Sequence, residues 1–272
     1  MTKPSARARR KLVARKGDET SDDRIIPAEV PVALTYDHAT YAVMMASPAD
    51  LEDFAIGFSL NERIVARADE ITDLEVVEMP RGYELRMALA TARASELESR
   101  RRRIAGPAGC GLCGIESLDA AVRPPPLIAT TLTVSPQTIF TALKTLAANQ
   151  PLNSETRAVH AAGFWSLATN SFTAVREDVG RHNALDKLAG ALARAHTDTA
   201  NGFIVMTSRI SIELVQKTCV MGAPLLAAVS APTTFALEAA EAANLTLIAV
   251  ARDDSFEIFT HPERIAAAAH VA

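Results

Sequence analysis

Two cysteines separated by two residues are the most reactive feature of the sequence. Cys110 and Cys113 lie in a glycine-rich segment, residues 106–114 (GPAGCGLCG). Glycine beside each cysteine leaves the sulfur accessible and lets the backbone adopt angles closed to other residues. Four consecutive arginines at 100–103 would lower the pKa of a nearby thiol and favour the thiolate, which is the nucleophilic form. These residues predict a mobile loop that carries thiol chemistry.

Three chemistries compete for such a cysteine pair. Structural zinc needs a second pair of ligands, but the third cysteine, Cys219, follows Val215 by four residues on the apolar face of a predicted helix, so we expect a buried core thiol. No metal site is therefore predicted. A thioredoxin-like redox pair follows a strand directly, whereas a glycine–proline loop precedes this one. Persulfide carriage, in which one cysteine accepts a sulfur atom and passes it on, is favoured over the redox pair.

His160 raises the question of a zinc deaminase. That chemistry uses H-x-E followed by P-C-x-x-C. Here Ala162 occupies the glutamate position, Gly109 occupies the proline position, and the cysteine pair precedes the histidine. Hydrolytic deamination is not predicted, and His160 is either a core histidine or the wall of a pocket.

Two regions of regular structure must position these residues. In residues 25–132, alternating apolar residues predict strands at 30–35, 40–45, 74–79 and 83–89. A helix is predicted after the second strand, with Ser47 as its N-cap and Pro48 at its first position. This region is β-rich and carries the cysteine loop.

Residues 133–272 alternate between helices and strands. Helices are predicted from Ser135-Pro136 onward, around 185–192, and at 212–221 and 235–243; strands are predicted at 163–167, 172–175, 203–206, 225–229, 246–250 and 256–260. This rhythm predicts an α/β domain with a parallel or mixed sheet that is covered on both faces.

Polar residues follow four of these strands, at 176–183, 207–211, 230–234 and 252–255. The carboxyl ends of strands in such a sheet face the N-termini of helices, which bind anions. The candidate contacts are Arg181, His182, Arg209, Arg252, Ser230 and Thr233. The plainer alternative is that these are ordinary helix caps and solvated turns. Because four loops may share one edge, we favour an anion or nucleotide site.

The overall composition excludes several classes of protein. The net charge is −4 and 49% of residues are hydrophobic, so neither nucleic acid nor a membrane is an expected partner. Three cysteines do not make a disulfide scaffold, and a cytoplasmic protein is expected. Residues 3–16 are basic and contain no acidic residue. We expect residues 1–24 to form a disordered basic tail.

These segments together resemble the FdhD family. The matching stretches are residues 29–32, 48–60, 110–114, 176–187, 216–217, 230–233 and 260–262. The resemblance extends over about residues 29–265, and the stretch 176–187 is the most specific part. The family usually has Ser-Gly-Arg where this chain has Thr207, Ser208 and Arg209.

The resemblance implies a sulfur carrier that formate dehydrogenases need for their maturation. A cysteine desulfurase would load sulfur onto Cys110, and Cys113 would relay or resolve the persulfide. The acceptor would be the molybdenum cofactor, bis(molybdopterin guanine dinucleotide), of which GDP is a partial mimic. The segment matching the family's cofactor-binding stretch comprises Val250, Ala251, Arg252, Asp253, Asp254 and Ser255.

The resemblance also implies a cytidine deaminase-like three-layer fold over 133–272 and a homodimer. Two alternatives stay open: a cofactor-binding chaperone without sulfur chemistry, and a thiol–disulfide oxidoreductase.

Overall fold

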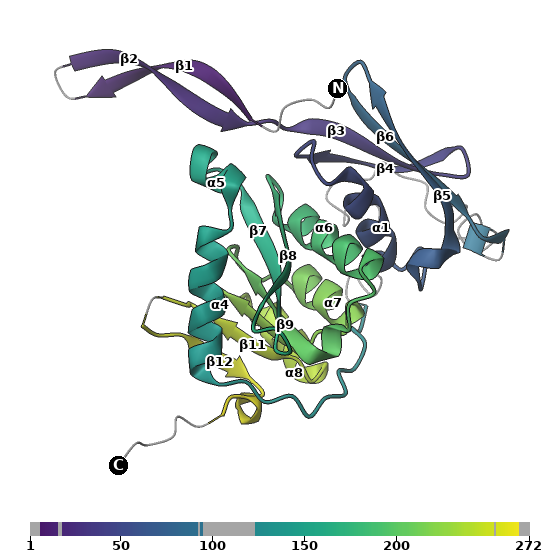
Figure 1. The fold of residues 1–272 in the computed structure, drawn as a ribbon, viewed down its shortest axis with the longest axis vertical. Coiled ribbons are helices and arrows are strands. Elements are labelled where there is room, and N and C mark those ends of the chain that lie inside the picture. The colour runs from purple at the N-terminus through teal and green to yellow at the C-terminus, as the bar shows by residue number, and fades with distance from the viewer. Residues whose placement is uncertain (1–5, 16–17, 92, 95–122, 253, 267–272) are drawn as a thin grey trace.

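The computed structural model describes residues 6–15, 18–91, 93–94, 123–252 and 254–266. Cys110, Cys113 and their loop at 106–114, as well as Asp253, lie outside these residues. The described chain forms an α/β structure with three sheets (Figure 1). No helix in the described part is both long and apolar enough to cross a membrane. The same residues contain no group of three or more metal-binding side chains.

The N-terminal region is a four-stranded sheet with one helix on its inner face. The strand order is β4-β3-β6-β5, with β3 (Val30–Tyr36), β4 (Ala39–Ala46), β5 (Ile71–Met79) and β6 (Gly82–Leu89). Asp37 and His38 both have positive φ, as a tight turn between antiparallel strands requires. Helix α1 (Leu51–Asn61) buries Phe54 and Phe58 against Val32 and Leu34. These elements confirm the predicted strands.

The C-terminal region is a six-stranded mixed sheet of order β12-β11-β10-β9-β7-β8. Its strands are β7 (His160–Ser166), β8 (Ser171–Asp178), β9 (Gly202–Met206), β10 (Leu225–Ala228), β11 (Thr246–Ala249) and β12 (Glu257–Thr260). Strands β9, β10 and β11 are parallel, whereas β7 and β12 run antiparallel to their neighbours.

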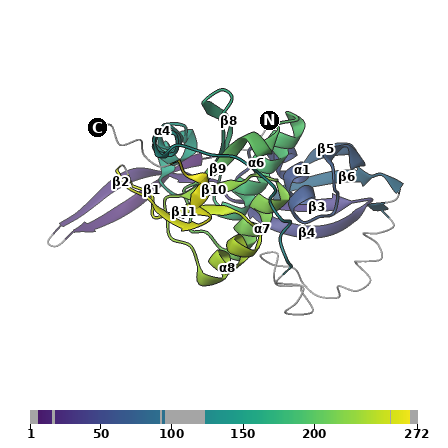
Figure 2. The ribbon, with the colours of Figure 1, turned by 90° about the horizontal axis from the view of Figure 1, so that it is seen from below.

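Helices cover both faces of this sheet, because its central strands are apolar on both sides. Helices α6 (Arg181–Arg194), α7 (Ile212–Val220) and α8 (Thr234–Ala242) pack on the face that presents Phe164 and Met206. Helix α4 (Pro136–Ala148) packs on the other face, against Trp165 and Phe203. Figure 2 shows α4 on the opposite side of the sheet from α7 and α8. Three layers result, as predicted.

Short elements complete the chain, and the predicted cap of α4 is confirmed. Ser135 Oγ accepts a hydrogen bond from Thr138 N at 3.1 Å. The remaining elements are α5 (Pro151–Thr156) and the 3-10 turns η1 (Ala68–Glu70), η2 (Thr199–Asn201) and η3 (Pro262–Arg264).

The first residues differ from the disordered tail expected over 1–24. They form a hairpin of β1 (Ala6–Arg15) and β2 (Asp18–Pro27), which extends away from the other sheets (Figure 1). Its backbone register runs from Ala6 opposite Pro27 to Arg15 opposite Asp18. A count of charge and apolar content does not detect such pairing between two adjacent strands. Arg24 joins the hairpin to α5, since its Nη2 donates to Thr156 O at 3.3 Å.

Candidate functional site

The four loops predicted to share one edge of the C-terminal sheet do so. Strands β9, β10 and β11 are parallel, and β8 runs in the same direction because β7 is antiparallel to both β8 and β9. Hydrogen bonds link successive loops: Thr233 N donates to Ile210 O at 3.0 Å, and Val250 N donates to Ser230 O at 3.3 Å. We call this set of loops (176–183, 207–211, 230–234 and 250–255) the carboxyl edge.

The carboxyl edge contains two helix N-termini and the side chain of Arg181. Helix α6 begins after Gly180 and α7 begins after Ser211, and neither N-terminus is capped by the side chain of that residue. Their N–H groups therefore point toward the edge with a positive helix dipole behind them. Arg181 Nε is buried and has no hydrogen-bond partner among the described residues. These groups can bind an anion.

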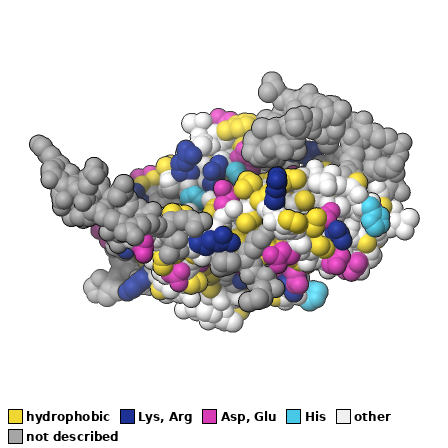
Figure 3. Space-filling view, turned by 90° about the horizontal axis from the view of Figure 1, so that it is seen from above, with side chains coloured by type: hydrophobic (Ala, Val, Ile, Leu, Met, Phe, Trp, Pro, Cys, Tyr) yellow, Lys and Arg dark blue, Asp and Glu magenta, His cyan; other side chains and the backbone are white. Residues whose placement is uncertain are grey.

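Two histidines lie at the same edge as neutral side chains. Burial, together with the charges of Arg181 and Lys217, lowers the pKa of His182 to about 4. His182 Nε2 lies 3.5 Å from Ser211 Oγ and 3.9 Å from Glu213 Oε2. His160 begins β7, where it lies opposite Asp178, and it is half-buried. Burial lowers the pKa of His160, and the positive charge of Arg181 lowers it further. His160 is therefore part of this edge and not of the apolar core. Figure 3 shows one face of the molecule, on which Lys and Arg side chains are interspersed with hydrophobic and acidic side chains.

The segment 250–255 turns sharply at the end of β11. Val250 has φ 52°, which is unusual for a β-branched residue and marks local strain. Ala251 is buried, Asp254 and Ser255 are exposed, and Arg252 N donates to Ser255 O at 2.7 Å.

Three candidate contacts are partly used by the protein itself. Arg252 Nη1 donates to Val229 O at 2.8 Å and to Ala251 O at 2.9 Å. Thr233 Oγ1 accepts from Ala236 N at 3.3 Å and caps α8. Ser230 is half-buried and its carbonyl binds Val250 N. Arg209 is exposed. Arg252 and Thr233 thus fix the conformation of the loops. The interpretation of these residues as ordinary helix caps and turns is therefore correct for part of their role.

Ser208 fits its position without strain. It stands where the resembling family has glycine, yet it is absent from the residues with positive φ. Its side chain is buried and its Oγ donates to Arg209 O at 3.0 Å. The loop 207–211 therefore does not require glycine's conformational freedom.

The stretch 176–187 has a second role that the sequence did not reveal. Asp178 Oδ1 accepts from Gly180 N at 2.8 Å and from Asn183 Nδ2 at 2.9 Å. Its Oδ2 accepts from Lys187 Nζ at 2.6 Å and from Ser47 N at 2.9 Å, across the junction with the N-terminal region. Asp178 therefore fixes the start of α6, where Arg181 and His182 lie, and holds the two regions together.

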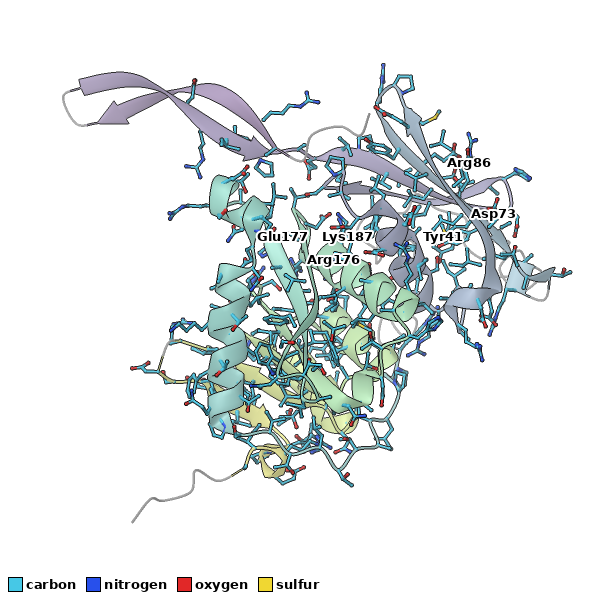
Figure 4. The ribbon with its side chains drawn as sticks, viewed as in Figure 1. Tyr41, Asp73, Arg86, Arg176, Glu177 and Lys187 are labelled. Carbon is cyan, nitrogen blue, oxygen red and sulfur yellow. The ribbon has the colours of Figure 1, made fainter. Side chains whose placement is uncertain are left out.

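Lys187 is fully buried in this network. Its ammonium donates to Ser47 O at 2.9 Å as well as to Asp178. In Figure 4, Lys187 and Arg176 lie between β8 and the N-terminal region. The sequence feature that could have predicted this network is Lys187 itself, a charged residue between Ala184 and Leu188, both of which are buried. A charge at such a position must be paired.

Ser47 is part of this network and does not cap α1, so the predicted cap is wrong. Helix α1 begins at Leu51, and its N-cap is Asp50 with φ 52°. Ser47 Oγ accepts from Val179 N at 3.2 Å. The local sequence predicts Ser47 as a helix cap, but its side chain instead contacts a segment that is distant in the sequence.

Further ion pairs join α1 and its C-cap residue Glu62 to β8, α6 and α7. Asp53 accepts from Arg176 Nε at 2.8 Å and from Arg194 Nη1 at 2.8 Å. Lys217 Nζ lies 2.8 Å from Asp186 Oδ1 and 3.2 Å from Glu62 Oε1. Burial would lower the pKa of Lys217, but the charges of Asp186 and Glu62 outweigh burial and raise it. These pairs are satisfied on both sides, as buried charges require.

The chain is thus an α/β protein in which buried ion pairs hold a four-stranded sheet and its helix against a six-stranded sheet, which has helices on both faces and helix N-termini at its carboxyl edge. It belongs to the FdhD/NarQ family, which matches residues 27–266. This confirms the family that the sequence motifs indicated.

Curated relatives match almost the whole chain. A protein of Agrobacterium fabrum is 52% identical over 252 residues, covering 92% of this chain and 93% of the relative. One of Xanthomonas axonopodis pv. citri is 46% identical over 272 residues, covering 97% and 96%. Both are named sulfur carrier protein FdhD.

A solved structure shows the same fold. It is a protein of Desulfotalea psychrophila proposed to be a formate dehydrogenase accessory protein. It is 24% identical, has a TM-score of 0.75, and covers 97% of this chain and 100% of its own.

Proposed function

We propose that this protein is a sulfur carrier that supports the maturation of a formate dehydrogenase. The observation that carries the proposal is near full-length identity of 46–52% to proteins named sulfur carrier protein FdhD. The chain also contains a C-x-x-C pair, at Cys110 and Cys113, whose glycine-rich surroundings suit an exposed nucleophile.

In the loading step, the thiolate of Cys110 attacks the terminal sulfur of a persulfide on a cysteine desulfurase. A new S–S bond forms on Cys110, and the desulfurase cysteine leaves as a thiolate. No external oxidant or reductant is needed, because one sulfur atom moves between two equivalent bonds. Cys219 does not compete: it is 2% exposed, and burial raises the pKa of its thiol to about 12.

The carboxyl edge is the proposed binding site for the acceptor, bis(molybdopterin guanine dinucleotide). Its phosphates would meet the N-termini of α6 and α7 and the buried Nε of Arg181. Such groups favour phosphate through hydrogen bonds and helix dipoles. Arg209 and the segment 250–255, which includes Asp253, would complete the site. A homodimer could supply two such sites for the two guanine nucleotides.

The chain can bring Cys110 to this edge. Gln216 of α7 donates from Nε2 to Arg123 O at 2.8 Å. Gln216 is five residues from Ser211, and five residues of helix rise roughly 7.5 Å. Thirteen residue steps separate Cys110 from Arg123, and they span at most roughly 43–47 Å when extended. Chain length therefore does not prevent sulfur delivery within one protomer.

Intact mass spectrometry tests the sulfur chemistry. The protein is incubated with a cysteine desulfurase and L-cysteine, and we expect a gain of one sulfur atom that a thiol reductant removes. Cys219→Ser should gain sulfur like the wild type, and Cys110→Ser should not. Undiminished loading of Cys110→Ser would contradict the assignment of Cys110. Absence of loading in all proteins, with nucleotide binding retained, would favour a chaperone without sulfur chemistry.

Calorimetric titration with GDP and ADP tests the carboxyl edge. We expect GDP to bind more tightly than ADP, and Arg181→Gln or Arg209→Gln to weaken GDP binding about tenfold, as loss of a charge-assisted hydrogen bond does. The control is Arg67→Gln, at an exposed arginine that pairs with Asp69 far from this edge. Equal binding of both nucleotides, or no effect of either substitution, would remove the edge from the proposal.

A further inference from the structure

The loop between β10 and α8 lies in the middle of the carboxyl edge. Strand β10 pairs with β9 on one side and with β11 on the other. The loop is joined to both neighbouring loops by backbone hydrogen bonds. On one side Thr233 N donates to Ile210 O, and on the other Val250 N donates to Ser230 O. A molecule that spans the carboxyl edge must therefore cross this loop.

Two large apolar side chains are exposed at the ends of this loop. Val229, which follows β10, is 40% exposed, and Phe235, in the first turn of α8, is 41% exposed. The residues next to them, Ala228 and Ala236, are fully buried. Ligand sites combine apolar and aromatic side chains with a few polar groups. The carboxyl edge has this composition at its central loop.

The ring of Phe235 is available to a ligand at this edge. Side chains in a helix tilt toward its N-terminus, so a side chain in the first turn of α8 leans toward the loops before it. Thr233 Oγ1 fixes that turn by accepting from Ala236 N at 3.3 Å. Ala236 and Ala240 are the residues of α8 that are buried in the core. No aromatic ring among the described residues packs on Phe235.

The backbone of Val229 is held in place by the neighbouring segment, residues 250–255. Arg252 Nη1 donates to Val229 O at 2.8 Å. Ala251 N donates to Ala228 O at 3.3 Å. An apolar surface on a backbone that is already fixed loses little conformational entropy when a ligand binds.

We propose that Val229 and Phe235, which we call the apolar shelf, bind the planar heterocycle of a nucleotide whose phosphates lie at the helix N-termini of the same edge. The inference rests on the proposed function and adds a base-binding part to that site. The ring of Phe235 would stack on the base, and such stacking tolerates any base because each has a π-face. The apolar shelf therefore adds affinity for guanine and adenine alike, and the polar groups of the edge supply the preference for GDP.

Calorimetric titration of the full-length protein with GDP, ADP and inorganic pyrophosphate tests the apolar shelf. Phe235→Ala should weaken the binding of GDP and of ADP by the same factor, about tenfold. It should leave pyrophosphate binding unchanged, because pyrophosphate has no base. Phe235→Tyr keeps a ring and should bind GDP within about twofold of the wild type. Phe235→Leu keeps an apolar side chain without a ring and should resemble Phe235→Ala.

The matched control is Phe259→Ala, which removes the same side chain from a position that is 37% exposed. Phe259 lies further from the carboxyl edge than Glu257, which pairs with Ala249 at the end of β11. This variant should bind all three compounds like the wild type.

Several results would overturn the apolar shelf and leave the rest of the carboxyl edge in place. They are undiminished GDP binding by Phe235→Ala, equal GDP binding by Phe235→Leu and the wild type, and an equal loss of affinity for pyrophosphate. A wild type that binds pyrophosphate as tightly as GDP would do the same. A wild type that binds neither compound would overturn the carboxyl edge and the apolar shelf together.

Discussion

His182 illustrates how the surroundings of one residue set its chemistry. It is the second residue of α6 and lies among cations, Arg181 and Lys217, in a largely buried position. Burial disfavours the imidazolium, and the two cations disfavour it further. At neutral pH the side chain therefore offers one N–H donor and one acceptor to the carboxyl edge.

The lowered pKa of His182 predicts a pH-dependent stability. The pKa is about 4 in the folded state and near 6.5 when unfolded, so the unfolded state binds the extra proton between these values. The contribution of His182 is present above pH 6.5 and is lost as pH falls toward 4. Between pH 7 and 4.5 the wild type should lose roughly 1–2.5 kcal/mol relative to His182→Gln.

Urea unfolding of both proteins at several pH values measures this difference. Parallel loss of stability in the wild type and His182→Gln would contradict the predicted titration. His160, whose pKa is also lowered by burial, remains in both proteins, so its contribution cancels.

At the scale of elements, α1 and α6 approach each other closely because two glycines face the contact. A Cβ at Gly57 would lie 1.7 Å from Asp186 O, and a Cβ at Gly190 would lie 1.9 Å from Asp53 O. Glycine in a helix normally costs stability. Here it permits the backbone-to-backbone approach that brings Asp53 and Asp186 to their partners.

Gly57→Ala should therefore destabilise the protein, although the same change in an ordinary helix stabilises it. We expect a loss of roughly 2–3 kcal/mol in the free energy of unfolding, because the backbones must separate to admit the methyl group. Glu52→Ala, at an exposed position of α1 whose carboxylate pairs with Arg194 Nη2 at 2.9 Å, should cost about 1 kcal/mol at most, as loss of an exposed ion pair does. Equal or greater stability of Gly57→Ala would show that the two helices can move apart freely.

The β1–β2 hairpin contacts the rest of the protein in a different way: Arg24 Nη2 donates a hydrogen bond to Thr156 O of α5 at 3.3 Å. Truncation to a chain that starts at Ile25 should cost about 1 kcal/mol or less, the usual net value of one hydrogen bond. Thermal unfolding of the full and truncated chains measures this. A large fall in melting temperature would mean that the hairpin stabilises the body of the protein.

At the scale of the whole molecule, buried polar groups join the N-terminal region to the C-terminal sheet. Asp178, Lys187 and Ser47 satisfy one another across this junction. Removing one partner from a buried pair leaves an uncompensated charge. The two regions should therefore unfold together as one cooperative unit.

Two natural probes can test this cooperativity. The single tryptophan, Trp165, lies in β7, and the three tyrosines, Tyr36, Tyr41 and Tyr83, all lie in the N-terminal sheet. Asp178→Asn should lower stability by about 3–5 kcal/mol and shift both transitions equally. Asp69→Asn, in an exposed pair with Arg67, should leave both transitions nearly unchanged, because solvent screens an exposed ion pair. Separate Trp and Tyr transitions in the wild type would show that the junction does not couple the regions.

The sequence by itself determined most helices and strands, because periodic burial is a local property. Residues 185, 188 and 192 lie on one face of a helix whatever else the chain does, and Ser135 caps α4 through a neighbour three residues away. Strand direction then followed from alternation with helices, so the four loops could be placed on one edge. The cysteine pair and the motif at 176–187 indicated the family.

Tertiary structure alone decided which polar residues serve the carboxyl edge and which hold the protein together. Ser47 and Asp178 are 131 residues apart, and Ser47 and Lys187 are 140 apart. Whether such groups meet depends on how two regions pack, which no local pattern contains. The hairpin depends likewise on pairing between strands and not on composition. A side chain's type limits the bonds it can make, and the fold selects among them by bringing its partners within reach.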